Sequence, residues 1–395
     1  MRAGRSWLAG VAASVVLSMS LTALVAVGPT DASAATPSFP PLASSISTPQ
    51  GSWAVVAMGD LAQLKNTFWQ LFFEAPGSTR WSLVTPTGAA DNGGLVSGIS
   101  AESVVAGIVP SLLLRYSPLA VSTDNGVHWS PVFFPTALAQ EPDALAYQAP
   151  GSGMGGGALA VTGAGRVLRA PASLVRWTPF VGASTLRTGS GCNAAGVDAV
   201  AFSGTGAPII ATGCRGGGTV GLFTRVGSSW HSSAISLNGR LSGSTTRVLR
   251  LVTSGSTTSA LVAGSGPRGQ GLVSLWRTDN GPWSLSATLP FASATRILSS
   301  AVSSNGAMTV LVRSPRHAPT PYTISRGGPW IRDPAPPATT ETIATDSPVA
   351  GTAQSTLEAF AVSGSHLSVF ALSATGSTWV RVQTSQIPVA YGSSG

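Results

Sequence analysis

Residues 119–129 read LAVSTDNGVHW: an apolar run, a short turn containing glycine, and a tryptophan. Related segments recur as VGLFTRVGSSW at 220–230, VSLWRTDNGPW at 273–283, YTISRGGPW at 322–330 and VFALSATGSTW at 369–379. The apolar run has the length of one short β-strand, and further strand-forming residues follow each tryptophan. Each segment therefore predicts a β-hairpin whose second strand begins at the tryptophan.

The tryptophans also reveal a long period. Seven of the eleven recur at intervals of 48, 48, 53, 53, 47 and 49 residues: Trp81, Trp129, Trp177, Trp230, Trp283, Trp330 and Trp379. A period near 50 that continues along the chain indicates radial repetition. Two more short strands precede each hairpin, for example Val197–Ser203 and Ala207–Gly213 in the fourth repeat.

Four antiparallel strands per repeat make one blade of a β-propeller. We therefore predict an all-β fold, a seven-bladed β-propeller with four-stranded antiparallel blades, over residues 47–395. The first blade contains Ser52–Met58, Thr67–Phe73 and Trp81–Val84, and residues near Ser45 would supply its innermost strand.

The composition agrees with an all-β chain. Only 9% of residues are charged, against roughly 25% in an average soluble domain. Glycine (47) and proline (28) are abundant. The 3.6-residue period of an amphipathic helix is absent beyond the N-terminal segment.

The N-terminal segment has the layout of a secretory signal. Arg2 and Arg5 precede an apolar stretch from Trp7 to Val27, and Ala32-Ser33-Ala34 is a small-residue cleavage triplet. We predict a signal peptide over 1–34, a lead-in segment over 35–46 and a secreted, extracellular protein. The alternative is an uncleaved membrane anchor, because the stretch is long enough to span a bilayer.

The charge balance of the chain limits the classes of partner that we expect it to bind. The formal net charge is +8, and Lys65 is the only lysine. The arginines are scattered singly in the sequence, which argues against nucleic acid as a partner. A cationic surface favours acidic polysaccharide or anionic cell-wall polymer. With few carboxylates, the fold has little stability to lose in acid. We expect a monomer with no membrane contact after signal cleavage.

The two cysteines, Cys192 and Cys214, flank the first hairpin of the fourth repeat, whose turn is expected near Ser203 and Gly204. They are therefore expected to face each other across the open end of that hairpin. An exported protein allows a structural disulfide; two free buried thiols are the alternative.

Residues 122–129 resemble a known sequence motif. Ser122, Asp124, Gly126 and Trp129 match the pattern Ser-x-Asp-x-Gly-x-x-Trp. The chain resembles the Asp-box (sialidase-repeat, or BNR) propellers, as a degenerate member without sialidase activity. Asp279, Gly281 and Trp283 form a shortened near copy. The resemblance implies structural roles at a turn on the rim, so neither Asp124 nor Asp279 is a catalytic candidate.

The sequence carries no catalytic signature. The Arg-Ile-Pro motif of the sialidases is absent, and no tyrosine has a glutamate placed beside it by the repeat. The histidines, His128, His231, His317 and His366, lack metal-ligand spacing. We therefore predict no catalytic residue, no metal and no cofactor.

Four charged residues stand at the head of the first strand in successive repeats: Asp143, Asp198, Arg247 and Arg296. These positions should surround one mouth of the central channel. One interpretation is a site for a polar ligand, with arginines binding anionic groups and carboxylates binding hydroxyls or cations. The other is a wet channel whose charged residues satisfy one another.

The leading functional hypothesis is an extracellular binding or scaffolding propeller that recognises carbohydrate or another exported protein. The alternative is a glycoside hydrolase of the Asp-box type with Asp143 and Asp198 as a divergent carboxylate pair, which requires facing carboxyls about 5 to 9 Å apart. A third hypothesis, an assembly factor, rests on fold analogy.

Overall fold

The computed structural model describes residues 42–388 except 60–66, 87–92, 102, 110–114, 151–155, 188–190, 238, 242, 267–268, 280, 293 and 347–355. Contacts divide the chain into two compact parts, Met1–Ser38 and Phe39–Gly395. All described residues belong to the second part. The predicted signal peptide (1–34) and residues 35–41 of the predicted lead-in lie outside the described residues.

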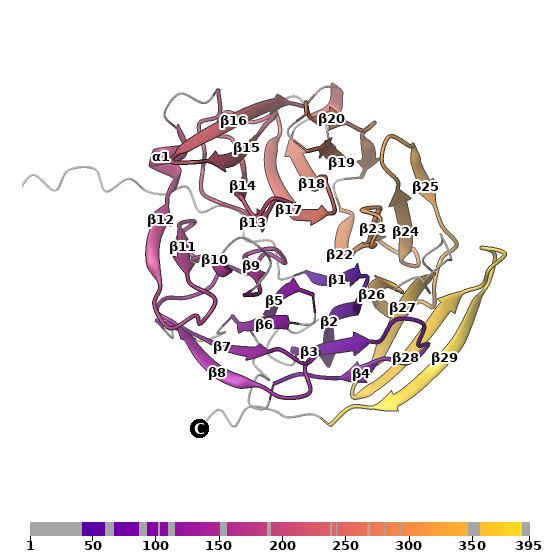
Figure 1. Ribbon diagram of the computed structural model, residues 1–395. Coiled ribbons are helices and arrows are strands. Elements are labelled where there is room, and N and C mark those ends of the chain that lie inside the picture. The colour runs from indigo at the N-terminus through magenta and orange to yellow at the C-terminus, as the bar shows by residue number, and fades with distance from the viewer. Residues whose placement is uncertain are drawn as a thin grey trace, which may run out of the picture. The chain divides into compact units, whose positions relative to one another are not determined.

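The second part consists of short strands arranged around a central axis (Figure 1). Its first strands are β1 (Ala43–Thr48), β2 (Gly51–Gly59), β3 (Thr67–Glu74), β4 (Ser82–Leu83), β5 (Leu95–Ser100), β6 (Ser103–Ile108), β7 (Ser117–Ser122), β8 (Ser130–Phe134), β9 (Leu145–Gln148), β10 (Gly157–Val161), β11 (Val167–Ala170), β12 (Thr178–Val181), β13 (Ala199–Phe202) and β14 (Pro208–Gly213).

The remaining strands are β15 (Thr219–Val226), β16 (Ser229–Ser236), β17 (Thr245–Ser254), β18 (Thr257–Gly266), β19 (Gly269–Thr278), β20 (Ser284–Leu285), β21 (Leu289–Phe291), β22 (Arg296–Val302), β23 (Met308–Arg313), β24 (Thr320–Ile324), β25 (Trp330–Arg332), β26 (Thr340–Thr345), β27 (Leu357–Ser363), β28 (His366–Leu372) and β29 (Trp379–Gln386). The described helices are α1 (Ala183–Arg187) and the 3-10 helix η2 (Gly239–Leu241). In the part of the chain that the structure describes, no helix is long and apolar enough to cross a membrane.

Among the described residues the strands form six hydrogen-bonded sheets. Five are built on consecutive four-stranded antiparallel units, β5–β8, β9–β12, β13–β16, β17–β20 and β26–β29, and β21 also pairs with β19. The sixth sheet has the order β25-β24-β23-β22-β1-β2-β3-β4. The prediction of an all-β propeller with four-stranded antiparallel blades is confirmed.

The eight-stranded sheet contains two antiparallel four-stranded units, β1–β4 and β22–β25. They are joined where β1 pairs in parallel with β22, from Ala43 opposite Ser299 to Ile46 opposite Val302. β1 bonds to β2 on one side and to β22 on the other. It spans Ala43–Thr48 and so includes Ser45, near which the sequence places the innermost strand of the first blade.

The repeat tryptophans lie where the sequence pattern predicts, at the start of the last strand of each four-stranded unit. Trp81 directly precedes β4, and Trp330 and Trp379 are the first residues of β25 and β29. From there the side chain reaches back to the preceding unit. Trp129, Trp330 and Trp379 donate their indole N–H to the carbonyls of Val84 (2.9 Å), Ala287 (3.0 Å) and Pro334 (3.1 Å).

Apolar side chains fill the junctions between neighbouring units. One cluster joins Leu119 and Phe134 of β5–β8 to Leu145 and Ala160 of β9–β12. Aromatic pairs strengthen such junctions, because edge-to-face rings add to the stabilisation from burial. Phe134 meets Trp177 edge-on, with ring centroids 4.9 Å apart.

The junction between the last unit and the first closes the ring. We call the contacts of Trp81, Glu358, Phe360 and Gln383 the closing interface. Trp81 is buried and donates its indole N–H to Glu358 Oε2 (2.6 Å), while Phe360 packs edge-on at 5.0 Å. Gln383 accepts from the Trp81 backbone N–H (2.8 Å) and donates to its carbonyl (2.9 Å). The strands of each unit are consecutive in the chain, so contacts between units join the two ends of the ring. These contacts include the side chains above and a backbone bond from the Gly59 N–H to the Gly364 carbonyl (3.3 Å).

Two buried carboxyl groups lie near the closing interface. Glu74 ends β3 and Glu358 lies on β27, and both are almost completely buried. Within the described ranges, neither oxygen of Glu74 has a hydrogen-bond partner. Burial, with the nearby charges of Glu358 and Asp346, raises the pKa of Glu74 to about 9. Burial likewise raises the pKa of Glu358 to about 8. Both groups are therefore protonated at neutral pH.

These carboxyl groups predict a fold that is more stable in mild acid than in mild base. The unfolded chain releases both protons near the ordinary pKa of 4.5, whereas the folded chain holds them up to a pKa of about 8 or 9. The stabilisation is complete below pH 4.5, declines progressively above it, and is fully lost once the pH has passed the folded values. Between about pH 5 and about pH 8 we expect the free energy of unfolding to fall by on the order of a few kcal/mol.

Urea denaturation across this pH range measures the effect. Glu74→Gln should flatten the decline because it removes one titrating group, whereas Asp279→Asn, at an exposed turn, should leave it unchanged. Stability that rises from pH 5 to 8 in the wild-type chain would contradict this account.

Candidate functional site

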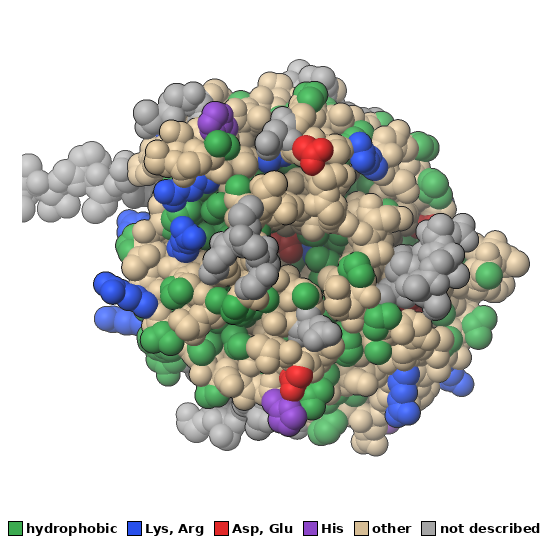
Figure 2. Space-filling model, in the orientation of Figure 1, with side chains coloured by type: hydrophobic (Ala, Val, Ile, Leu, Met, Phe, Trp, Pro, Cys, Tyr) green, Lys and Arg blue, Asp and Glu red, His purple; other side chains and the backbone are tan. Residues whose placement is uncertain are grey.

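The first strands of the four-stranded units surround a cavity of about 130 Å³ on the axis. Its walls come from β1, β5, β9, β13 and β17, and its polar lining residues include Ser45, Ser97, Asp143, Tyr147 and Arg250. Figure 2 shows a hollow near the centre of one face, with acidic side-chain atoms deep inside it. The volume lies below the roughly 300–1,000 Å³ of pockets for drug-sized ligands. The cavity therefore suits a small polar group or part of a larger ligand.

Arg250 connects several walls of this cavity through hydrogen bonds. It lies on β17 and is 2% exposed. Its Nε donates to Asp143 Oδ2 (3.0 Å), and its Nη1 donates to the carbonyls of Ser45 and Ser300 (both 3.1 Å). A single guanidinium thus bonds β17 to β1, to β22 and to the segment before β9.

A second ion pair lies beside the first. Arg247 Nη2 bonds Glu141 Oε1, and both side chains are mostly buried. Burial lowers the pKa of Arg247 to about 10. Asp143 Oδ2 also accepts the backbone N–H of Leu251 (2.6 Å). The segment 141–143 and strand β17 are therefore joined across the axis by two charge pairs and a charge-assisted backbone bond.

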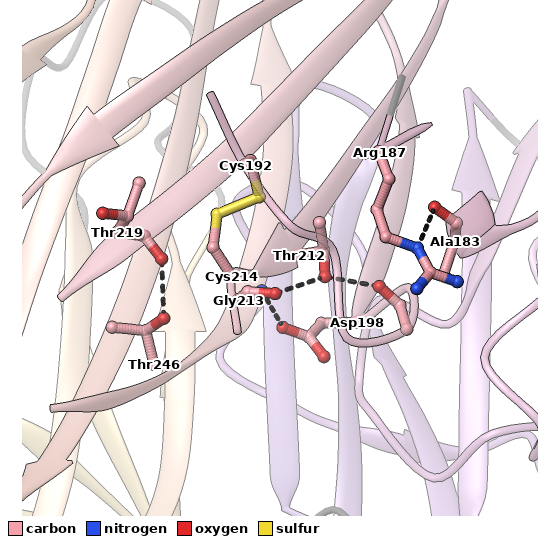
Figure 3. The surroundings of a disulfide bond; sticks show 10 residues. Ala183, Arg187, Cys192, Asp198, Thr212, Gly213, Cys214, Thr219 and Thr246 are labelled. Atoms are coloured by element: carbon pink, nitrogen blue, oxygen red, sulfur yellow. Dashed lines mark hydrogen bonds between the residues drawn. A yellow bond between two sulfur atoms is a disulfide. The ribbon is translucent and has the colours of Figure 1, made fainter. Parts of the chain in front are cut away.

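Asp198 has a different role from Asp143. Its Oδ2 accepts the backbone N–H of Gly213 on β14 (2.9 Å; Figure 3). It also accepts the backbone N–H of Val248 on β17 (3.0 Å), so it joins the two strands. Burial raises the pKa of Asp198 to about 6, and the two backbone donors limit the rise. Asp198 is not among the described residues that line the cavity, although Asp143 is. The structure does not place the two carboxyl groups of the hydrolase hypothesis in one cavity.

The disulfide lies beside Asp198 (Figure 3). Cys192 and Cys214 are bonded, with their Cα atoms 5.2 Å apart. They flank the hairpin of β13 and β14, whose turn spans 203–207 as the sequence predicts. The prediction of a disulfide is confirmed, and the bond holds the chain leading into β13 against the end of β14.

Arg296 stands apart from the other predicted channel residues. It is the first residue of β22 and is exposed. No ion pair joins it to an acid in the described ranges. Among the four residues predicted at the mouth, Asp143 and Arg247 thus reach the same layer of ion pairs, Asp198 is buried between two units, and Arg296 faces solvent.

Sequence reasoning missed two members of the ion-pair layer, Arg250 and Glu141. Arg250 follows Arg247 by three residues in Arg-Val-Leu-Arg, and Glu141 precedes Asp143 by two. A bulge between Val248 and Arg250 alters the pairing of β17 with β18. Because a bulge changes the side-chain alternation of a strand, period-two reasoning could not assign Arg250 to the axis.

The turn at 122–129 is organised by its own side chains. Ser122 Oγ donates to Asp124 Oδ1 (2.7 Å) and accepts the Gly126 N–H (2.8 Å), while Asp124 accepts the His128 N–H (3.0 Å). Gly126 has a φ of +83°, which favours glycine. The turn delivers Trp129 to the preceding unit, and the contacts at Asp124 are internal to the turn.

The shortened copy at 278–283 is held differently. Asp279 has a φ of +48°, and the Gly281 N–H donates to the Thr278 carbonyl (3.0 Å). The guanidinium of Arg277 lies 4.8 Å from the ring centroid of Trp283. Asn280 lies outside the described residues. Among the residues that are described, no group of three or more His, Cys, Asp or Glu side chains could hold a metal ion.

Comparison with known proteins finds solved structures with a similar fold. No protein-family model matches the chain, and no curated protein matches it. The BP39L lectin from Burkholderia pseudomallei is similar in structure, with a TM-score of 0.52 and 14% identity over 88% of this chain and 100% of the lectin. A protein from Lactobacillus plantarum is also similar, with a TM-score of 0.51 and 11% identity over 86% of this chain and 97% of the other. At such identities the likeness concerns the fold alone.

Removing the hydrogen bonds of the Arg250 side chain should destabilise the protein strongly. Arg250→Met leaves the carboxylate of Asp143 without its cation, and breaking one half of a buried ion pair costs on the order of 3–5 kcal/mol. Adding Asp143→Asn removes the uncompensated charge and should recover part of that loss. Urea denaturation measures both variants.

Arg332→Met, on the exposed outer strand β25, is the matched control and should change stability by less than about 0.5 kcal/mol. An Arg250→Met variant as stable as this control would show that these hydrogen bonds are dispensable.

Proposed function

We propose that the mature chain is an exported, monomeric binding propeller that recognises carbohydrate at the axial cavity and catalyses no reaction. The observation that carries the proposal is the hydrogen bonding of the charged side chains that line the cavity. Arg250 and Asp143 are bonded to each other and to backbone groups. They are thereby held in place as part of a polar wall that joins blades.

The cavity lining suits hydroxyl groups. Residues with hydroxyl side chains, Ser97, Tyr147 and Thr253, are among those that line it, and Asp143 Oδ1 is not used in the bonds to Arg250 and Leu251. Hydroxyls both donate and accept hydrogen bonds, so such a lining complements a sugar. The similarity in fold to the BP39L lectin supports carbohydrate as the ligand class by analogy.

We further propose seven blades. The units β1–β4 and β22–β25 are counted as separate blades because each has its own tryptophan at the last strand, Trp81 and Trp330. The parallel contact that joins them extends over four residue pairs of their first strands. β26, the first strand of the last blade, meets both: Ser45 Oγ donates to the Ile343 carbonyl (3.2 Å), and the Ile343 N–H donates to Ser299 Oγ (3.0 Å).

An Asp-box ancestry and export complete the proposal. The internal bonds of Ser122 and Asp124 fit a structural box on the rim. Export rests on the signal-like segment 1–34 and is compatible with the disulfide.

Binding to a panel of neutral mono- and oligosaccharides, measured by calorimetry on the folded protein, tests the function. Ser97→Phe fills the cavity and should weaken binding at least about tenfold, whereas Thr79→Phe, on an exposed loop, should change it less than about twofold. A folded wild-type protein that binds no sugar of the panel would refute the proposal. Release of reducing sugar would refute the claim that the protein lacks catalysis.

A further inference from the structure

The arginines of one stretch have almost no acidic counterpart. Residues 166–225 contain six arginines, no lysine, no glutamate and a single aspartate. The aspartate is Asp198, which is buried and bonded to backbone N–H groups. The positive charge of this stretch is therefore not neutralised from within it.

The fold gathers four of these arginines about two neighbouring blades. Two guanidinium groups lie near the ring of Phe180 on β12, with Arg169 at 5.7 Å and Arg225 at 4.8 Å from the ring centroid. Trp230 at the start of β16 packs edge-on against the same ring at 5.6 Å. Arg169 belongs to β11 and Arg225 to β15, so the junction between the blades brings together charges that are far apart in sequence.

Two more arginines contact the segment that follows Phe180. Arg166 lies beside Gly182. Arg187 donates from Nε to the Ala183 carbonyl (3.3 Å) in α1. We call Arg166, Arg169, Arg187 and Arg225 the arginine surface. Figure 2 shows basic side chains and no acidic side chain at the edge of the face over β11, β12 and α1.

The side chains of the arginine surface are available to a partner. Arg166, Arg169 and Arg187 are exposed, and Arg225 is half-buried. No ion pair involves any of the four in the part of the chain that the structure describes. Backbone carbonyls orient Arg187 and Arg225 through Nε, which leaves their terminal nitrogens for other contacts. Guanidinium groups held in this way suit bidentate binding of carboxylates.

We infer that the arginine surface binds an acidic polysaccharide whose sugars carry carboxylate groups. The inference rests on the proposed export and carbohydrate recognition, and it adds a second site remote from the axial cavity. Several separated cations favour a polymer over a single sugar, because one chain can meet them together. Nucleic acid fits less well, since a base needs an accessible aromatic ring on which to stack. The half-buried Phe180 ring already contacts Arg169, Arg225 and Trp230.

Polygalacturonate is the probe, dextran the neutral control and single-stranded DNA the competing class of polymer. We expect folded protein to bind polygalacturonate and not dextran, with affinity falling several-fold between about 50 and about 300 mM salt. The double variant Arg169→Gln/Arg225→Gln should weaken binding at least about tenfold.

Arg332→Gln/Arg381→Gln removes the same charge from exposed positions on β25 and β29 and should weaken binding less than about twofold. Equal losses of affinity in the two double variants would show that only net charge matters and would overturn the inference. Absence of binding to polygalacturonate would also overturn it. Tighter binding of DNA that depends on Arg169 and Arg225 would assign the surface to nucleic acid instead.

The two sites can be judged separately. Ser97→Phe should leave polygalacturonate binding unchanged, because the cavity is not part of the arginine surface. If no neutral sugar binds but polygalacturonate still requires Arg169 and Arg225, the axial proposal fails and the arginine surface stands. If Ser97→Phe abolishes polygalacturonate binding, the separate surface is refuted.

Discussion

A tryptophan at the start of each outermost strand reaches back to the blade before it, and the rest of the ring depends on this contact. The indole adds apolar contact at the junction, and where its N–H bonds an acceptor in the neighbouring blade, that bond fixes its direction. Within the described residues, the indole N–H groups of Trp177 and Trp283 have no such partner. At Trp129, Trp330 and Trp379 the acceptor is a main-chain carbonyl. At Trp81 it is the side chain of Glu358, where the first and last blades meet. One of the contacts that close the ring is therefore a bond to a buried acid whose pKa burial raises.

Closing the ring brings the first strand of each blade to the axis, and the side chains of these strands determine the chemistry at the axis. Small hydroxyl side chains let the strands approach closely: Ser45 and Ser299 bond the backbone of β26, and Arg250 reaches from β17 to Ser45 and Ser300. The charges predicted at this place are mostly used to join blades. The proposed binding at the axis uses what remains there, the hydroxyl groups of the lining residues and Asp143 Oδ1. Arginines without an ion pair among the described residues lie at the outer edge.

The architecture could be predicted from sequence because its signals are local. The tryptophan interval, the turn before each tryptophan and the cysteine spacing each act within one hairpin or one repeat, and the blades and the Cys192–Cys214 bond agree with them. The site depends on contacts between blades. The bonds of Arg250 to Asp143 and of Trp81 to Glu358 join residues 107 and 277 positions apart. Arginines that look scattered in the sequence likewise meet at Phe180 because two blades bring them together.

Hydrogen exchange on Trp81→Phe, compared with Trp330→Phe, tests the central claim most directly. Both substitutions remove an indole N–H, but only Trp81 connects the first and last blades. The account predicts that Trp81→Phe speeds amide exchange in both β1–β4 and β26–β29, because the buried Glu358 loses its donor and the ring opens there. Trp330→Phe should affect only its own blade and the one before it. Exchange in β26–β29 that is unchanged by Trp81→Phe would contradict the account.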